Sequence, residues 1–242
     1  MNSADEEEES RPLYARVREQ LIERIRSGAW KPGQLIPNEF EIAREFGVSQ
    51  GTARKAISAL AAEQLVHRRQ GRGTFVVQHT PAHVLFRFFQ LFEDAGAQII
   101  PDSRRAVPVR APANAAERAA LGLDEGEQVI RIARTRLRHA KPFIVETIAL
   151  PDALFPGLAD LPELPNTLYD HFQKTYGVLV VRADERITAV AADKQAAAAL
   201  ELAEGTPLLR IDRTAYGLVD QPVEWRVSQC HLQNAYYLAR LR

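Results

Sequence analysis

A short polar corner between two segments with helical periodicity constrains the fold of this chain more than any other feature. The corner is Gly47–Ser49. The segment before it opens at Asn38, and Glu41 three residues later completes the signature of a capping box. Ser49 is expected to cap a further helix that reaches Gln64. Two helices joined by so short a turn predict a helix-turn-helix.

The flanking segments predict a third helix and a small β-hairpin. A first helix is expected over residues 12–26, because apolar residues recur every four positions from Leu13 to Ile25. Residues 65–69 and 74–77 are typical of two strands around a glycine-rich turn. The hairpin would form a wing beside the helix-turn-helix, a combination that places one helix in a groove of DNA.

The outer face of the helix after the corner is polar, which favours DNA binding over an ordinary helical corner with a solvated face. In helix-turn-helix geometry the first residues of the second helix reach base edges. Arg72 would lie at the tip of the wing, within reach of phosphate or a minor groove. The candidate DNA-contacting residues are Asn38, Glu39, Ser49, Gln50, Thr52, Arg54, Gln70, Gly71 and Arg72.

Charge is divided unevenly along the chain, although the whole chain is neutral. Residues 11–79 hold twelve Lys and Arg against six Asp and Glu, whereas residues 80–242 hold nineteen against twenty. A basic segment of this kind is typical of nucleic-acid binding. We expect a disordered acidic tail over residues 1–10, a winged helix over 11–78 and a linker over 79–83. A second domain would span residues 84–242.

An internal duplication organises this second domain. Residues 121–135 parallel residues 200–214, and a proline follows each copy at nearly the same distance. Each copy predicts a helix, a turn and two strands joined by a hairpin. The expected helices are 113–121 and 193–203, and the expected strands are 127–138, 142–150, 178–190, 207–217 and 222–231. These elements predict an α+β fold, a mainly antiparallel sheet with helices and a cleft where its halves meet.

Strand alternation places charged side chains on an apolar face of this sheet. Ile130 and Ile132 share a face with Arg134 and Arg136, and Glu146 points to the apolar side of the next strand. A buried carboxylate needs a partner, because an unpaired buried charge is costly. Two interpretations remain open. These groups form an ion-pair network, or they line a site for a small anionic metabolite, since Arg offers forked donors to phosphate or carboxylate.

The N-terminal motifs carry a family resemblance. Residues 36–39, 48–54 and 71–75 resemble the winged-helix domain of the GntR family of bacterial transcription regulators. Gln50 stands where that family usually has Arg. Arg typically reads guanine, whereas Gln prefers adenine.

The rest of the chain, from about residue 84 to 240, resembles the UTRA effector-binding domain of the HutC-type branch of that family. The matching positions are Arg134, Arg136, Pro142, Glu146, residues 167–169, residues 193–207 and residues 222–224. The resemblance implies an effector site with its anionic group held by the two arginines. The implied effector-binding residues are Arg134, Arg136, Glu146, Thr167 and Glu224. The phenylalanine-rich segment 84–92 also admits an aromatic or apolar acid.

The leading hypothesis is therefore a transcription repressor that a small anionic effector releases from double-stranded DNA. A homodimer would read a palindromic operator, and the effector must bind two conformations with different affinity. One alternative is an enzyme acting on a small carboxylic acid, because the UTRA fold resembles that of chorismate lyase. No nucleophile–base pair is visible, so we expect no enzyme. Another alternative is a DNA-compacting protein held by phosphate contacts alone.

Several further expectations follow from what the sequence contains. The lone Cys230 excludes an intramolecular disulfide. The histidines show no ligand spacing, so we expect neither a metal site nor a cofactor. No apolar run is long enough for a membrane span and no signal peptide is visible, which predicts a cytoplasmic protein without a membrane partner.

Overall fold

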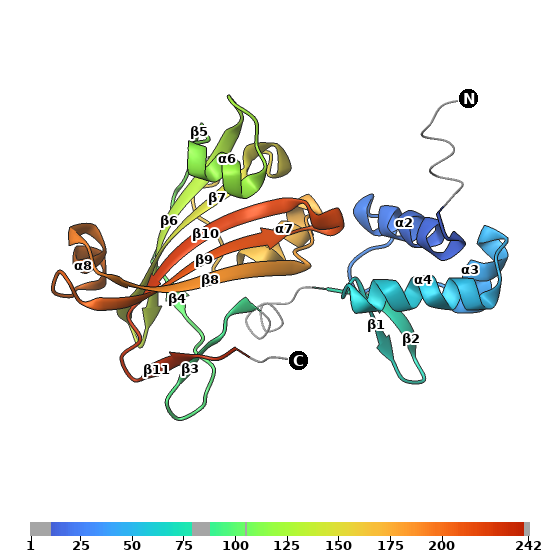
Figure 1. Cartoon of the computed structure of the whole chain (residues 1–242), viewed down its shortest axis with the longest axis horizontal. Coiled ribbons are helices and arrows are strands. Elements are labelled where there is room, and N and C mark those ends of the chain that lie inside the picture. Colours follow the sequence, from blue (N-terminus) through green and yellow to red (C-terminus); the bar gives the residue numbers. More distant parts are fainter. Residues whose placement is uncertain (1–10, 79–87, 105, 240–242) are drawn as a thin grey trace. The chain divides into compact units, whose positions relative to one another are not determined.

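The structure, a computed structural model, describes residues 11–78, 88–104 and 106–239 and divides into two compact units, residues 1–79 and 80–242 (Figure 1). The acidic tail predicted for residues 1–10 and the linker predicted for residues 79–83 lie outside the described residues. Among the helices of the described ranges, none is both long and apolar enough to cross a membrane.

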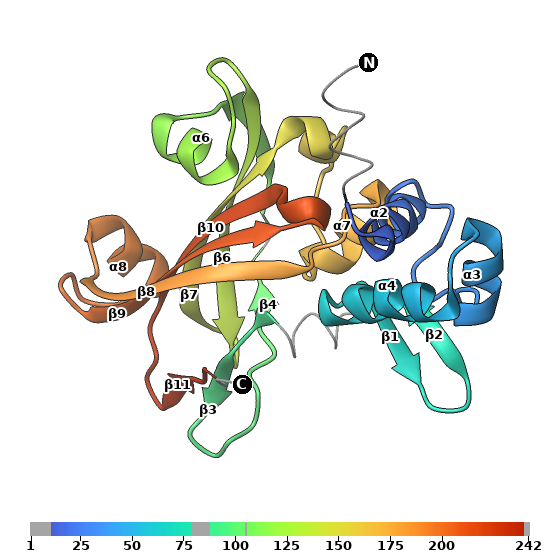
Figure 2. The ribbon, with the colours of Figure 1, turned by 45° about the vertical axis from the view of Figure 1, so that its right-hand side comes forward.

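The first unit has the predicted three helices and hairpin (Figure 2). Its elements are α2 (Leu13–Arg26), α3 (Glu39–Phe46), α4 (Gln50–Ala62), β1 (Val66–Arg69) and β2 (Gly73–Val76). The hairpin is antiparallel, from Val66 opposite Val76 to Arg69 opposite Gly73. Leu13 is 56% exposed, so the apolar stripe of α2 enters the core only from Val17 onwards.

The helix starts at the corner are set by side-chain caps. The Asn38 side chain accepts hydrogen bonds from the backbone N–H groups of Phe40 and Glu41, both at 3.0 Å. Glu41 accepts the backbone N–H of Asn38 at 2.8 Å, which confirms the capping box. Gly47 ends α3 with φ 62°, a conformation that favours glycine. The Ser49 hydroxyl accepts the backbone N–H of Thr52 and so begins α4.

The second unit is built on one antiparallel sheet of seven strands in the order β4-β6-β7-β10-β9-β8, with β5 also paired to β6. Its strands are β4 (Asp102–Ser103), β5 (Pro108–Pro112), β6 (Gln128–Arg138), β7 (Lys141–Pro151), β8 (Arg182–Ala191), β9 (Pro207–Tyr216) and β10 (Pro222–Cys230). A separate pair joins β3 (Leu91–Glu93) to β11 (Ala235–Tyr237). Its helices are α6 (Ala115–Leu121), α7 (Leu168–Tyr176) and α8 (Lys194–Leu200). The predicted α+β class is confirmed.

One strand starts later than predicted. Residues 178–190 were expected to be extended throughout, but β8 begins at Arg182. The backbone N–H of Val178 bonds the carbonyl of Phe172 and so closes the end of α7, and Val180 is fully buried. Val178 therefore ends α7 and Val180 packs in the core, and only the residues from Arg182 onwards pair in the sheet.

The duplication is visible in the topology (Figure 1). The hairpins β6–β7 and β9–β10 are joined by the antiparallel pair β7–β10, so the two copies of the duplication are adjacent in the middle of the sheet. The helices α6 and α8 precede the two hairpins, and their caps Asn114 and Asp193 occupy equivalent positions. Each copy thus folds in the same way, as the repeated sequence predicts.

The two faces of the sheet have different coverings. Val129 packs with Leu121 of α6, whereas its neighbour Ile130 packs with Phe172 of α7. Since successive residues of a strand point to opposite faces, α6 and α7 lie on opposite sides of the sheet. On the α7 side two apolar clusters are separated, one around Phe172 and one around Ile144 and Cys230.

We expect Phe172→Ala to lower the free energy of unfolding of the second unit by about 3–5 kcal/mol, because a buried aromatic side chain leaves a cavity. Phe172 is fully buried, and its ring centroid lies 4.5 Å from that of Phe155. Urea unfolding followed by circular dichroism measures the change. Lys174→Ala, on the exposed side of the same helix, is the control and should change stability by less than about 0.5 kcal/mol. Equal stability of the two variants would contradict this packing.

Candidate functional site

Three elements of the first unit meet at one carboxylate, Glu39. The Arg54 Nε of α4 donates to Glu39 at 2.8 Å. The Arg68 Nη2 of β1 donates to the same carboxylate at 3.3 Å and to the Ser58 hydroxyl at 3.2 Å. Both arginine side chains remain at least half exposed. Glu39 therefore holds two cations side by side at the surface.

The residues predicted to contact DNA fall into two groups. Gln50, Arg54 and the turn residues 70–72 are exposed. Asn38 and Ser49 use their side chains to cap helices, and the Ser49 hydroxyl also lies 2.9 Å from that of Thr52. Glu39 orients arginines instead of offering a donor to phosphate. Direct DNA contact by any of these residues stays a prediction.

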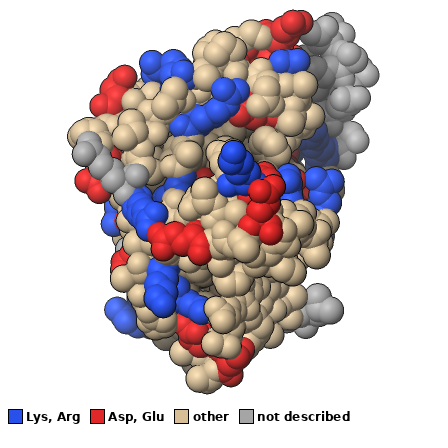
Figure 3. All heavy atoms as spheres, turned by 90° about the vertical axis from the view of Figure 1, so that its left-hand side faces the viewer, with Lys and Arg blue, Asp and Glu red and all other residues tan. Residues whose placement is uncertain are grey.

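Surface charge on the face that carries α8 is mixed. Figure 3 shows Lys and Arg side chains interspersed with Asp and Glu over this face, with no broad area of one sign among the residues drawn in colour. The sequence count agrees, since residues 80–242 carry nineteen basic and twenty acidic side chains. This face therefore lacks the charge distribution that attracts DNA phosphates.

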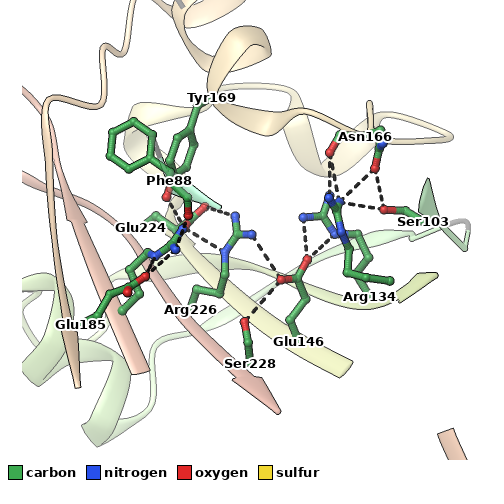
Figure 4. A network of polar contacts seen from close by, with 12 residues as sticks. Phe88, Ser103, Arg134, Glu146, Asn166, Tyr169, Glu185, Glu224, Arg226 and Ser228 are labelled. Carbon is green, nitrogen blue, oxygen red and sulfur yellow. Dashed lines mark hydrogen bonds and ion pairs between the residues drawn. The ribbon is translucent and has the colours of Figure 1, made fainter. Parts of the chain in front are cut away.

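A band of charged side chains crosses the α7 side of the sheet between the two apolar clusters (Figure 4). Strand pairing sets its order. Arg134 of β6 lies opposite Glu146 of β7, and Arg213 of β9 lies opposite both Arg226 of β10 and Glu185 of β8. The band therefore runs across five adjacent strands and spans both copies of the duplication.

Glu146 lies at the middle of this band. Its carboxylate accepts the Arg134 Nε at 2.6 Å, the Arg226 Nη1 at 3.2 Å and the Ser228 hydroxyl at 3.4 Å. Burial alone would raise the pKa of Glu146, but the surrounding guanidinium groups, Arg134 foremost, hold it well below its ordinary value of 4.5. Glu146 is therefore a charged carboxylate, and Arg134 is already paired in this structure.

Arg226 is the second centre of the band. It donates to Glu224 at 3.0 and 2.7 Å in addition to Glu146. Burial alone would lower the pKa of Arg226, but these two carboxylates raise it well above its ordinary value. The Tyr169 hydroxyl of α7 donates to Glu224 at 2.8 Å. At the far end Arg213 pairs with Glu185 and donates to the Phe88 carbonyl at 2.5 Å.

Arg136 differs from the other arginines of the band. It is 5% exposed, and its Nη1 donates to the Ser103 hydroxyl at 2.8 Å and to the Asn166 side chain at 2.9 Å. Its Nε has no hydrogen-bond partner, and no carboxylate of the described residues forms an ion pair with it. Burial, followed by repulsion from Arg134, lowers the pKa of Arg136 to about 9. Within the part of the chain that the structure describes, Arg136 is thus a buried cation without an ion-pair partner.

A small cavity, partly open to solvent, lies at this arginine. Its lining comes from β6, β9, β10, the start of α7 and the segment before β3, and includes Phe88, Phe89, Arg134, Arg136, Asn166, Thr167, Leu168, Tyr169, Arg213 and Arg226. A second cavity shares Phe89, Arg213 and Arg226 and is lined by Glu146. Glu224, by contrast, is fully buried behind Arg226 and lines neither cavity.

Of the five predicted effector-binding residues, Arg134, Arg136 and Thr167 line the first cavity, Glu146 lines the second, and Glu224 pairs with Arg226. Sequence reasoning missed Arg213, Arg226, Tyr169 and Asn166. The duplication contained a signal for one of them, because Arg213 stands in the second copy where Arg134 stands in the first. The ion-pair interpretation of the charged face is confirmed for Arg134 and Glu146, whereas the anion-site interpretation stays a prediction. Within the described ranges, no group of His, Cys, Asp and Glu is arranged to hold a metal ion.

Comparison with known families agrees with both units. The family described as "Bacterial regulatory proteins, gntR family" matches residues 13–76, and the family described as "UTRA domain" matches residues 101–235. The chain is 31% identical to the HTH-type transcriptional repressor NagR of Bacillus subtilis (strain 168), over 85% of this chain and 84% of that protein. It is 27% identical to the histidine utilization repressor of Pseudomonas putida, over 85% of this chain and 82% of that protein.

Solved structures show the same folds. The ligand-binding domain of a GntR-family transcriptional regulator from Bordetella bronchiseptica is 32% identical, with a TM-score of 0.59, over 64% of this chain and 98% of that chain. The regulator YydK of Bacillus subtilis subsp. subtilis str. 168 matches over 96% of this chain and all of that chain. Its TM-score is 0.54 at 14% identity, a likeness that concerns the fold alone.

We expect Arg54→Ala to weaken binding to specific DNA by about 1–3 kcal/mol, as the loss of an arginine–base contact does. The exposed Arg54 is positioned on α4 by Glu39. Fluorescence anisotropy with a DNA fragment selected by the protein measures the affinity. Arg104→Ala removes one exposed, ion-paired arginine of the second unit and is the control. Undiminished affinity in the Arg54 variant would exclude this residue from the DNA interface.

We expect Glu146→Gln to lower the free energy of unfolding by about 3–5 kcal/mol at pH 7, because two buried arginines lose their shared carboxylate. The pKa of Glu146 is lowered in the folded protein, so its stabilisation is present above pH 4.5 and is lost as the pH falls below that value. The difference from the wild type should therefore narrow in acid.

Denaturant unfolding between pH 3 and pH 7 tests this pH dependence, with the exposed Glu163→Gln as the control. A constant difference between wild type and Glu146→Gln over that range would show that Glu146 is not held ionised by its neighbours.

Proposed function

The chain belongs to the GntR family of bacterial regulatory proteins and carries a UTRA domain, and we propose that a small anionic effector bound at Arg136 releases it from DNA. The protein is a DNA-binding transcription repressor, as the sequence predicted. The alternative prediction of an enzyme finds no support among its relatives, which are transcription regulators.

The observation that carries the effector proposal is the buried cation without a counter-ion. Arg136 lines the cavity, lacks an ion pair within the described part of the chain, and keeps an Nε without a hydrogen-bond partner. An anion at this position would neutralise the charge of Arg136 and accept a hydrogen bond from its Nε. Charge-assisted hydrogen bonds of this kind are strong. The lowered pKa of Arg136 reflects the same unfavourable burial.

The start of α7 supports an anion at the same place. Thr167 occupies the N-cap position, but its side chain makes no capping hydrogen bond. Thr167 and Leu168 line the cavity beside Arg136. A helix N-terminus carries partial positive charge and N–H donors, so it adds to the attraction of Arg136. Relatives described as repressors of fructoselysine and histidine utilization are consistent with control by small metabolites.

Release from DNA requires the effector to bind two conformations with different affinity. The cavity lies between the start of α7 and the sheet, and polar contacts connect the two. Asn166 accepts hydrogen bonds from Arg134 and Arg136 of β6, and Tyr169 of α7 donates to Glu224 of β10. We propose that occupancy of the cavity shifts α7 relative to the sheet. Two chains would form a cytoplasmic homodimer through their second units and read a palindromic operator.

We expect Arg136→Gln and Arg134→Ala to bind operator DNA normally and to lose release by effector. Arg136→Gln should also cost less than about 1 kcal/mol of stability, because the removed charge is unpaired. Anisotropy of an operator fragment, selected from genomic DNA, measures release by small acids. Arg138→Gln is the matched control, since Arg138 lies on the same strand but is paired with Glu93. Normal release of the Arg136 variant would place the effector elsewhere.

A further inference from the structure

The charges around the cavity define which anion fits. Resting on the proposed effector site, we propose that the effector is a monocarboxylic acid with a flat, apolar, preferably aromatic body. Its single carboxylate would pair with Arg136 and its ring would lie against the phenylalanine side of the cavity. This class excludes sugar phosphates and dicarboxylates, which carry two negative charges.

The charge count comes from the seven buried or nearly buried ionic groups of the band. Four guanidinium groups face three carboxylates, which leaves one positive charge in excess. The four are Arg134, Arg136, Arg213 and Arg226, and the three are Glu146, Glu185 and Glu224. Asp102 is the next carboxylate that acts on Arg136, but it is exposed and forms no ion pair with it. One negative charge on the ligand would therefore balance the band.

A second negative charge would find no free cation at the other end of the cavity. Arg213 and Arg226 also line it, but Glu185 and Glu224 already pair with them. The duplication shows why these carboxylates are needed. Arg226 follows Pro222 by four residues, as Glu146 follows Pro142, so Arg226 is the second-copy equivalent of Glu146. The pair Arg134–Glu146 of the first copy therefore corresponds to the pair Arg213–Arg226 in the second. Carboxylates from β8 and β10 offset this repulsion.

The walls near Arg136 fit a flat apolar body. The Phe89 ring centroid lies 6.0 Å from the Arg136 guanidinium carbon. Phe88 and Tyr169 meet edge to face with centroids 5.1 Å apart. The adjoining cavity, which shares Phe89, adds the apolar side chains of Leu91, Ile144, Ile211 and Cys230. A carboxylate on Arg136 thus places the rest of the ligand beside rings and aliphatic groups, where an aromatic ring packs well.

Four probes separate charge from shape in calorimetric titrations of the full-length protein. Benzoate carries one charge and a ring, terephthalate carries two charges and the same ring, benzamide is neutral, and acetate has the charge without the ring. We expect benzoate to bind at least about 10-fold more tightly than each of the others, because only benzoate satisfies both requirements. Benzoate binding should disappear in Arg136→Gln and persist in Arg138→Gln.

A charge variant tests the count directly. Glu224→Gln removes one of the three carboxylates with little change of shape and raises the excess to two positive charges. The ratio of benzoate to terephthalate affinity should then fall by at least about 10-fold relative to the wild type. The thermal transition of the variant establishes that it is folded. If the variant is not folded, the affinities of the wild-type protein for the four probes test the proposal.

The outcomes are distinguishable. Tighter binding of terephthalate than of benzoate to the wild type would overturn the single-charge inference and leave the anion site intact, provided that Arg136→Gln abolishes it. Equal affinity for acetate and benzoate would overturn the apolar-body inference. Failure of benzoate, terephthalate and acetate to bind at millimolar concentration, together with failure of phenyl phosphate as a fifth probe, would overturn this inference together with the proposed effector site.

Discussion

The arrangement of the second unit depends on one carboxylate placed where the two halves of the sheet meet. Glu146 of the first copy bridges Arg134 of the same hairpin and Arg226 of the other hairpin. A buried carboxylate in this position is stable because both guanidinium groups reach it, and Glu146 in turn is the ion-pair partner of Arg134. The duplicated hairpins are thereby joined by ionic contacts as well as by backbone pairing.

The same band links the sheet to α7. Tyr169 donates to Glu224 beneath Arg226, and Asn166 receives donors from Arg134 and Arg136 just before the helix begins. The N-terminal turn of α7 is thus fixed by polar contacts, whereas Phe172 further along is fixed by apolar packing. A helix held in two different ways along its length can respond at one end to a change of charge while its other end stays packed.

The elements with local signals could be predicted from the sequence, and the contacts across strands could not. The capping box at Asn38, the stop at Gly47 and the repeated hairpins follow from residue type and spacing. Which strands adjoin is a long-range property, so the pairing of Arg226 with Glu146 had no local signal. Glu224 pairs with Arg226 and does not line the cavity, and its part in effector binding stays a prediction.

The charged groups of the two units differ in exposure, which gives them different responses to ionic strength. Arg54, Arg68 and Arg72 are exposed, so dissolved ions screen their charges and compete with them for DNA phosphates. The ion pairs between Glu146 and its two arginines are buried between two apolar clusters, so dissolved ions screen them much less. Rising salt should therefore weaken the binding of DNA far more than the ion pairs that join the two halves of the sheet.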